Sequence, residues 1–278
     1  PEPNDCASIQ RMYPHGKINT EAFLSAARQA RSLITDASAS AFPWEFTGPD
    51  NIGGRITDIE SPAGNPSTLY VGAATGGIFK TTDLGATWTN LFKYVPVVTV
   101  GDIAIDPTNP QVIYCGTGEA NSSSFSFLGN GMYRSSNGGE SWDHIGLENS
   151  AYISRVIVDY SNAQRLFVAA NGNLFSNGDQ RGVYRTENGG TTWEKVLFIN
   201  DSTAAIDLVQ HPQNPQVLFA SMWERSRGLS YRRSFGDGSG IWKSTDGGTT
   251  WSELTNGLPT GSNVGRIGIS MAKRIPMS

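Results

Sequence analysis

A fourfold internal repeat is the feature that most restricts how this chain can fold. Four eight-residue segments share the pattern S/T-x-D/N-x-G-x-T/S-W, and they occupy residues 81–88, 135–142, 186–193 and 244–251. Their spacing gives a period of about 50 residues, which is typical of folds built from repeated structural units. Because the same positions recur in every copy, we interpret the segments as copies of one unit.

Each copy of the motif is predicted to form a hairpin turn, since one short strand precedes it and another follows its tryptophan. The Asp or Asn side chain is expected to accept backbone N–H bonds inside the turn, and the Ser and Thr hydroxyls to bond neighbouring backbone. The glycine supplies a positive φ without steric cost, and the tryptophan packs the turn onto the sheet. The structural positions are Asp83, Gly85, Trp88, Asn137, Gly139, Trp142, Asn188, Gly190, Trp193, Asp246, Gly248 and Trp251.

The complete repeat contains four predicted strands. An apolar-rich strand comes first, a turn such as 106–110 leads into the second, and the motif joins the third strand to the fourth. Four strands in about 50 residues make one blade of a β-propeller. The chain is therefore predicted to be all-β, with about four complete blades and the start of a fifth. The predicted blades are 54–98, 99–150, 151–202 and 203–258, and the next begins at 264–271.

The segments that flank the repeats bear on how the propeller, predicted over residues 44–278, is completed. Residues 44–48 resemble the strand that follows each motif, so we expect them to be an outer strand donated to the last blade. A ring closed in this way needs two more strands after residue 270. We therefore expect the chain to be part of a longer propeller, and a tight, irregular ring with an incomplete final blade is the alternative.

An N-terminal extension, residues 1–43, is predicted to contain one amphipathic helix over residues 19–34, with Asn19 or Thr20 as its N-cap. Apolar residues recur there at helical spacing and are expected to face the propeller. They are Phe23, Ala26, Ala27, Ala30, Leu33 and Ile34. A helix that binds a partner is the alternative.

Composition excludes several classes of function. The formal net charge is −4 and no run of five basic residues occurs, so no nucleic-acid partner is expected. Cys6 and Cys115 form no CxxC pair and the His residues do not cluster with them, so neither a metal nor a cofactor is predicted. Cys115 lies in an apolar run and is expected to be buried. No apolar run is long enough to predict a membrane span, and a chain that begins at Pro1 resembles a processed secreted protein.

The motifs at Asp83, Asn137, Asn188 and Asp246 resemble the Asp-box, or BNR, repeats. These repeats occur in sialidases, xyloglucanase-like glycoside hydrolases, sortilin-type (Vps10) propellers and photosystem-assembly propellers. Residues 44–55 and 222–225 look most like large secreted bacterial sortilin-like propellers, which often carry a sorting domain for type IX secretion. The resemblance covers residues 44–270 and implies the fold. It implies no activity, because the box is structural in all these families.

Two catalytic motifs of these families do not match this chain. Residues 274–276 read Arg-Ile-Pro, as in sialidases, but they follow the last box instead of preceding the first. Xyloglucanase-like enzymes carry a catalytic Asp in an Arg-Thr-Asp-Val-Gly-Gly segment after the second strand of the first blade. The matching residues 72–77 contain no carboxylate. The resemblance therefore weighs against both of these mechanisms.

The loops around the central channel, 116–130, 171–181 and 221–240, are the expected ligand site. Glu119 and Glu224 are the candidate catalytic residues, because glycoside hydrolysis needs two carboxylates close together. The alternative is that both pair with neighbouring arginines. The ligand-binding candidates, any of which could instead be structural, are Trp223, Arg225, Arg227, Tyr231, Arg55 and Arg155.

The leading hypothesis is a non-catalytic binding or scaffold propeller, secreted or at the cell surface, that recognises a polysaccharide or protein partner through these loops. The second is a glycoside hydrolase or lyase that acts on an extracellular polysaccharide with Glu119 and Glu224. The third is a component or cargo of a bacterial secretion or assembly machinery. A close carboxylate pair favours the enzyme, whereas carboxylates that are each held by an arginine favour the binding protein.

Overall fold

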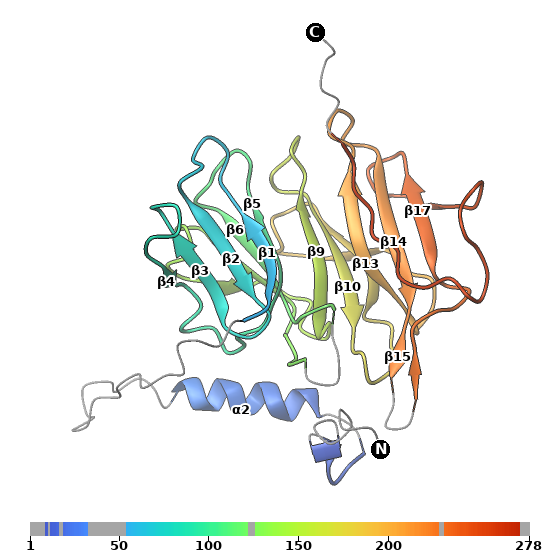
Figure 1. Cartoon of the computed structure of the whole chain (residues 1–278), viewed down its shortest axis with the longest axis horizontal. Helices are drawn as coiled ribbons and strands as arrows, with labels where there is room; N and C mark the ends of the chain where they lie inside the picture. Colours follow the sequence, from blue (N-terminus) through green and yellow to red (C-terminus); the bar gives the residue numbers. More distant parts are fainter. Residues whose placement is uncertain are drawn as a thin grey trace.

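The computed structural model describes residues 9–10, 12–16, 19–32, 54–121, 126–227 and 231–272 of the chain. Beyond helix α2 (Thr20–Ser32) and a few helical residues before it, the described residues form strands and turns. Four antiparallel four-stranded sheets stand side by side as propeller blades (Figure 1). The predicted all-β propeller with four blades is confirmed.

Each blade follows chain order from its inner to its outer strand. The first comprises β1 (Ile56–Glu60), β2 (Leu69–Ala73), β3 (Gly77–Thr81) and β4 (Thr89–Asn90). The second comprises β5 (Val100–Ile105), β6 (Ile113–Thr117), β7 (Met132–Ser135) and β8 (Asp143–His144). The third comprises β9 (Tyr152–Val158), β10 (Leu166–Gly172), β11 (Arg181–Thr186) and β12 (Glu194–Leu197). The fourth comprises β13 (Thr203–Gln210), β14 (Leu218–Glu224), β17 (Gly240–Ser244) and β18 (Ser252–Leu254), and between β14 and β17 lies a separate hairpin of β15 (Ser226–Arg227) and β16 (Arg232–Arg233).

The hydrophobic cores lie between consecutive blades. Strands β6 and β10 are buried along their whole length, because the second and third blades each pack against a neighbour on both faces. Each core contains buried side chains from two blades, such as Ile78 and Ile113 in the first, Met132 and Val168 in the second, and Phe167 and Leu218 in the third. Burial of each such side chain stabilises the fold by about 1.5–3 kcal/mol. Cys115 is fully buried in the first core, as predicted, and burial raises the pKa of its thiol well above the ordinary value.

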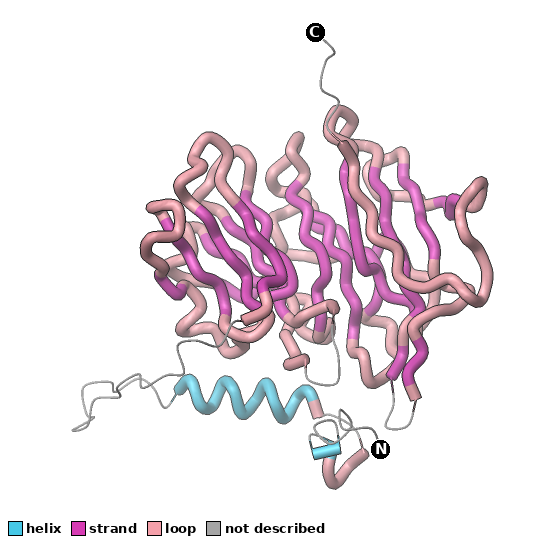
Figure 2. The backbone as a smooth tube through the Cα atoms, viewed as in Figure 1, coloured by secondary structure: helices cyan, strands magenta, loops and turns pink. Residues whose placement is uncertain are grey.

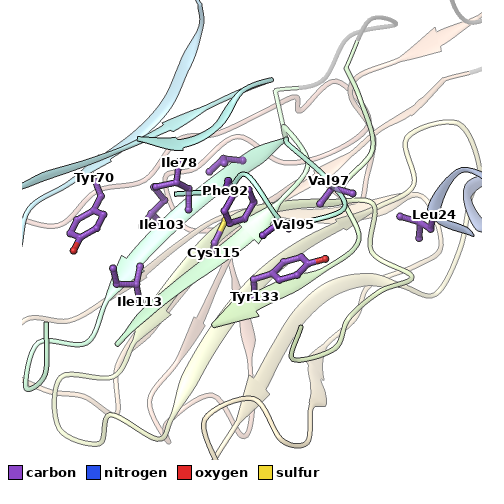
Figure 3. Close-up of a cluster of buried hydrophobic side chains, with 11 residues drawn as sticks. Leu24, Tyr70, Ile78, Phe92, Val95, Val97, Ile103, Ile113, Cys115 and Tyr133 are labelled. Carbon is purple, nitrogen blue, oxygen red and sulfur yellow. The ribbon is translucent and has the colours of Figure 1, made fainter. Parts of the chain in front are cut away.

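Helix α2 lies across one end of the blades (Figure 2). Asn19 Oδ1 accepts the backbone N–H three residues further on at 2.9 Å, so Asn19 is the N-cap. Leu24 is buried and lies beside Val97 at the margin of the first core (Figure 3). Phe23, which the apolar stripe placed toward the propeller, is 42% exposed. The predicted inward stripe is therefore wrong for Phe23, Ala26 and Ala30, which are exposed, and Leu24 is the buried apolar residue of the helix.

The box turns form the predicted hydrogen bonds. In the second blade Asn137 Oδ1 accepts the Ser141 N–H at 3.0 Å, and Ser135 Oγ accepts the Gly139 N–H at 2.8 Å. The other three boxes repeat both bonds. The box glycines have φ between 80° and 95°, as predicted. At the position before the box glycine the other three boxes have a second glycine, whereas the first box has Leu84. Leu84 nevertheless takes the left-handed conformation, with φ of 58°.

The boxes also join neighbouring blades, which the sequence pattern did not predict. Trp142 Nε1 donates to the Leu91 carbonyl of the preceding blade at 3.2 Å, and Trp193 Nε1 donates to the Ile145 carbonyl at 2.6 Å. A Cβ on Gly139 would lie 2.4 Å from Leu91 Cδ1. The glycine is therefore favoured by its backbone conformation, and its missing side chain also leaves room for Leu91 of the preceding blade.

The ring of blades is open. Inner strands contact one another in chain order, β1 with β5, β5 with β9 and β9 with β13. After β18, Ile269 N–H donates to Asp207 at 3.1 Å, just as Ile103 of β5 donates to Asp58 of β1 at 2.9 Å. Residues 264–270 thus lie where the next inner strand would stand, and no other described strand pairs with them. The predicted donated strand at 44–48 lies outside the described residues, as do Cys6, Leu33, Ile34 and residues 274–276.

Candidate functional site

A bulge in each inner strand brings charged side chains together at the centre of the blades. The ladder skips one residue in β1, β5, β9 and β13, and the residues that follow the bulges are Asp58, Asp102, Arg155 and Asp207. Arg155 donates to Asp102 at 3.0 Å and to Asp207 at 3.1 Å. Bulges re-aim side chains out of the regular alternation. Arg155, a predicted ligand-binding residue, is therefore an ion-pair bridge between blades in this structure.

Two carboxyl groups near Arg155, those of Asp102 and Glu60, have raised pKa values. Burial raises the pKa of Asp102 well above its ordinary value, an effect larger than the opposing attraction of Arg155. Burial, followed by the negative charge of Asp58, raises the pKa of Glu60 to about 7. The Arg155 guanidinium is thus ion-paired with two acidic side chains, Asp102 and Asp207, at the centre of the propeller. Among the described residues no cluster of His, Cys, Asp and Glu has the arrangement needed to hold a metal ion.

Glu119 lies just after β6, where a parallel bridge pairs it with Ile153 of β9. Its side chain is 2% exposed. It forms an ion pair with Arg55, and Ser126 Oγ donates to the same carboxylate oxygen at 3.1 Å. Arg55, predicted as a ligand-binding residue, is itself exposed and reaches across from the start of the first blade to hold this buried acid.

Glu224 ends β14 and is also buried. Arg233 pairs with its Oε1 at 3.0 Å, Ser202 Oγ donates to the same oxygen at 3.4 Å, and the Gly238 N–H donates to Oε2 at 3.0 Å. Three donors from different segments therefore fix the position of this carboxylate.

Each candidate catalytic carboxylate is thus held by an arginine. The partners, Arg55 and Arg233, differ from Arg225 and Arg227, which lie closest to Glu224 in sequence. The sequence could not predict this choice of partner, because Arg55 is far from Glu119 in the chain and Arg233 depends on the fold of the β15–β16 hairpin. The ion pairs are the arrangement that we associated with a binding protein.

Trp223 is buried and packs with Ala120 and Ile206. Its Nε1 donates to the Ser234 carbonyl at 2.7 Å. The guanidinium of Arg225 lies 4.5 Å from the centre of the Trp223 ring, and that of Arg266 lies 5.9 Å from it. The Trp223 ring, which was a candidate for stacking on sugars, is therefore covered by protein groups. The charged groups next to it are the guanidinium groups of Arg225 and Arg266.

The β15–β16 hairpin carries further cations from the loop between β14 and β17. Arg227 and Arg232 are directly opposite each other in its ladder. Arg232 is exposed, and Tyr231 beside it is 58% exposed. Burial, followed by the nearby charge of Arg227, lowers the pKa of Arg225 to about 10, and Arg266 and Arg232 act in the same direction. The structure thus brings together the predicted residues Arg225, Arg227 and Tyr231.

One important residue of this region was not predicted. Arg181 opens β11 and is 1% exposed. One of its terminal nitrogens donates to the carbonyls of Ser202 at 2.7 Å and Arg225 at 2.6 Å. The other donates to the carbonyls of Asn173 at 2.8 Å and Ser176 at 3.3 Å. Burial lowers its pKa to about 10, so the guanidinium is charged at neutral pH and ties three loops together.

Comparisons with known proteins agree with this fold. The family model for sortilin, neurotensin receptor 3, matches residues 130–262. A curated xyloglucanase from Paenibacillus sp is 25% identical over 250 residues, which are 82% of this chain and 24% of that protein. This chain is a propeller that resembles sortilin-like and xyloglucanase-like propellers. It spans about a quarter of the length of the curated relative.

Solved xyloglucanase-like propellers show the same fold. An ancestral GH74 enzyme superposes with a TM-score of 0.60 at 22% identity, over 75% of this chain and 26% of the enzyme. The GH74 xyloglucanase from Xanthomonas campestris superposes with a TM-score of 0.53 at 17% identity, over 71% of this chain and 29% of the enzyme. In this propeller the residues matched to the catalytic segment form a tight turn after β2, where Ala74 is 3% exposed and donates its N–H to the Arg55 carbonyl at 2.9 Å. Within the described residues no helix is long and apolar enough to cross a membrane.

Proposed function

We propose that this chain is a non-catalytic binding propeller of a secreted or cell-surface protein, and that it recognises an extracellular polysaccharide through the loops that follow β6, β10 and β14. The observation that carries the proposal is the state of Glu119 and Glu224, each of which is ion-paired to an arginine. A hydrolase needs one carboxylic acid free to give up a proton and a second group free to attack or to activate water. Residues 72–77 supply no replacement carboxylate.

The likeness to xyloglucanase-like propellers supports the choice of a polysaccharide over other partners. Because the proposed ligand is an extracellular polysaccharide, we also propose that the protein is secreted or located at the cell surface. The long loop between β14 and β17 supports a recognition role, because long loops on a rigid scaffold commonly carry binding function. A glycoside hydrolase is the second candidate, and the same xyloglucanase likeness favours it.

One experiment tests both candidates. The chain is run in native gels that contain xyloglucan or other neutral and acidic polysaccharides, and release of reducing ends is measured in parallel with the wild type and Glu119→Gln/Glu224→Gln. Retardation without release of reducing ends is expected. Asp143→Asn, which removes an exposed acid of β8, is the matched control. Turnover by the wild type that is lost in the double variant and kept in Asp143→Asn would establish the hydrolase instead.

A further inference from the structure

We propose that a neutral polysaccharide chain binds along the outer edge of the second blade, in two adjoining hollows that meet at His144 and Glu148. The first hollow lies between helix α2 and the second blade, and the second lies between the second and third blades. This inference rests on the proposed function, because it takes the class of ligand from it. It goes beyond that function by assigning a further binding surface, at the outer strands, and by stating the charge of the ligand.

The first hollow has a volume of about 560 Å³. On the helix side Leu24 is buried, and Glu21 and Arg28 lie on the same helical face, three residues before it and four after it. Hollows of about 300–1,000 Å³ are typical of ligand sites. The blade side is aromatic and polar, and its lining includes Tyr133, Trp142, Asn130 and Asn149. Both walls therefore offer hydrogen-bonding groups to a ligand held between them.

The second hollow has a volume of about 810 Å³. It lies between residues 143–148 of the second blade and the box residues 188–193 of the third. His144 and Glu148 line this hollow as well as the first, and both are exposed. The two hollows are therefore neighbours on either side of these side chains, and a linear chain of sugar units can extend from one into the other.

Arg134, which lines the second hollow, has hydrogen-bonding capacity that its counterparts use within the protein. A basic residue precedes the box in every blade. Lys80 of the first blade donates to a glycine carbonyl of the next box at 3.4 Å, and Arg185 of the third blade makes the same bond at 3.1 Å. Arg134 makes no such bond to the box of the third blade and no ion pair with a described residue, and its guanidinium lies beside the Tyr114 ring. Its donors thus suit the hydroxyl oxygens of a ligand.

The shape of a sugar unit matches the kinds of side chain along the two hollows. A sugar ring has apolar C–H faces, and the half-buried rings of Trp142 and Trp193 each line one of the hollows. Its hydroxyls both donate and accept hydrogen bonds, as amide side chains do. The amide side chains that line the hollows are Asn130, Asn149, Gln164 and Asn188.

The charges along the hollows indicate that the chain is neutral. The lining contains two cations, Arg28 and Arg134, and three acids, Glu21, Asp143 and Glu148. An acidic polymer is attracted by a surface with an excess of positive charge, and these hollows have none. Carboxylates and guanidinium groups of mixed sign can instead bond the hydroxyls of a neutral sugar.

The test is native affinity electrophoresis in gels that contain xyloglucan, galactomannan or polygalacturonate at several concentrations, so that retardation gives a dissociation constant. The wild type is expected to bind a neutral polymer more tightly than polygalacturonate. Asn149→Ala tests the first hollow, Arg134→Gln the second, and Glu148→Gln the junction between them. Each variant removes a group that bonds hydroxyls, so each should weaken binding of the neutral polymer by about three- to tenfold.

Matched controls separate recognition from charge and from folding. Glu140→Gln neutralises an exposed acid in the box of the second blade that lines neither hollow, and Lys243→Gln neutralises the basic residue before the box of the fourth blade. Both controls should keep the affinity of the wild type. Glu148 and Asn149 are exposed, so Glu148→Gln and Asn149→Ala should melt within about 2 °C of the wild type.

The outcomes distinguish this inference from the proposed function. If a polysaccharide still retards all three variants as it does the wild type, or if the two controls lose as much affinity as the variants, the groove is wrong and the proposed function stands. Tighter binding of polygalacturonate than of both neutral polymers overturns the neutral ligand. Failure of every polysaccharide to retard the wild type overturns both proposals.

Discussion

Substitution of Arg181 tests whether one buried guanidinium holds the channel-face loops in place. Arg181→Met keeps most of the side-chain volume and removes all donors to the carbonyls of Asn173, Ser176, Ser202 and Arg225. A net hydrogen bond contributes about 1 kcal/mol, so loss of four bonds should lower the free energy of unfolding by about 4 kcal/mol. Arg181→Lys keeps the charge but not the planar fork, and it should lose about half as much.

The assay is urea unfolding followed by tryptophan fluorescence. Arg232→Met makes the same chemical change at an exposed position and should alter the free energy of unfolding by less than about 0.5 kcal/mol. Arg181→Met should also weaken oligosaccharide binding, because the Arg225 backbone loses its tether. A loss of stability below about 1 kcal/mol in Arg181→Met would refute the argument that this side chain ties the loops together.

Three further predictions concern the blades and their ionisation. Gly139→Ala should cost about 3 kcal/mol in urea unfolding, since φ is 95° and the new Cβ would lie 2.4 Å from Leu91 Cδ1. Gly257→Ala, with φ of 74° and open space around it, should cost only about 1 kcal/mol, and equal losses would contradict the role of blade contact. Hydrogen bonds from Thr250 lower the pKa of Asp246 from 3.8 to about 2, so the stability that the ionised Asp246 gives the folded protein is present above pH 3.8 and is lost as the pH falls toward 2. The melting temperature of Asp246→Asn should therefore depend less on pH across this window. An unchanged dependence would refute the assignment. The pKa of Glu60 is raised from 4.5 to about 7, so this group's contribution to the stability of the folded protein is fully present below pH 4.5 and is lost as the pH rises through 7. Glu60→Gln should therefore raise the melting temperature at pH 8 and not at pH 4. A lower melting temperature at pH 8 would contradict this sign.

The turns of this propeller could be predicted from sequence because their physics is local. The Asn137 side chain and the Ser141 N–H that it binds are four residues apart, so the motif contains both partners. The blade contact of Trp142 could not be predicted, because its acceptor, the Leu91 carbonyl, is 51 residues earlier and carries no side-chain signature. Periodicity showed where the strands lie but not which blade surfaces approach most closely.

The candidate site was predicted by residue type and only partly by arrangement. Loop length and composition identified Arg225 and Arg227 as members of a channel-face site. The position of Arg227 opposite Arg232 depends on the register of the β15–β16 hairpin, which sequence alone does not reveal. Arg181 escaped notice because its partners are backbone carbonyls from three loops, and carbonyls leave no pattern in a sequence. Helix α2 shows the same limit, since the predicted apolar stripe contained Phe23 and not Leu24, and only the packed structure shows that Leu24 is the buried residue.

The tryptophan bonds that run from the second and third boxes to the preceding blades, together with the cores between consecutive blades, make the propeller a one-dimensional array. In such an array stability is approximately a sum of blade terms and nearest-neighbour interface terms. Damage to the box of one blade therefore weakens the adjoining interface and leaves blades farther along the chain near their original stability. A blade can accordingly be duplicated or exchanged as a cassette, provided that the cut preserves both the box tryptophan and the carbonyl that receives it, as Trp193 and Ile145 do here.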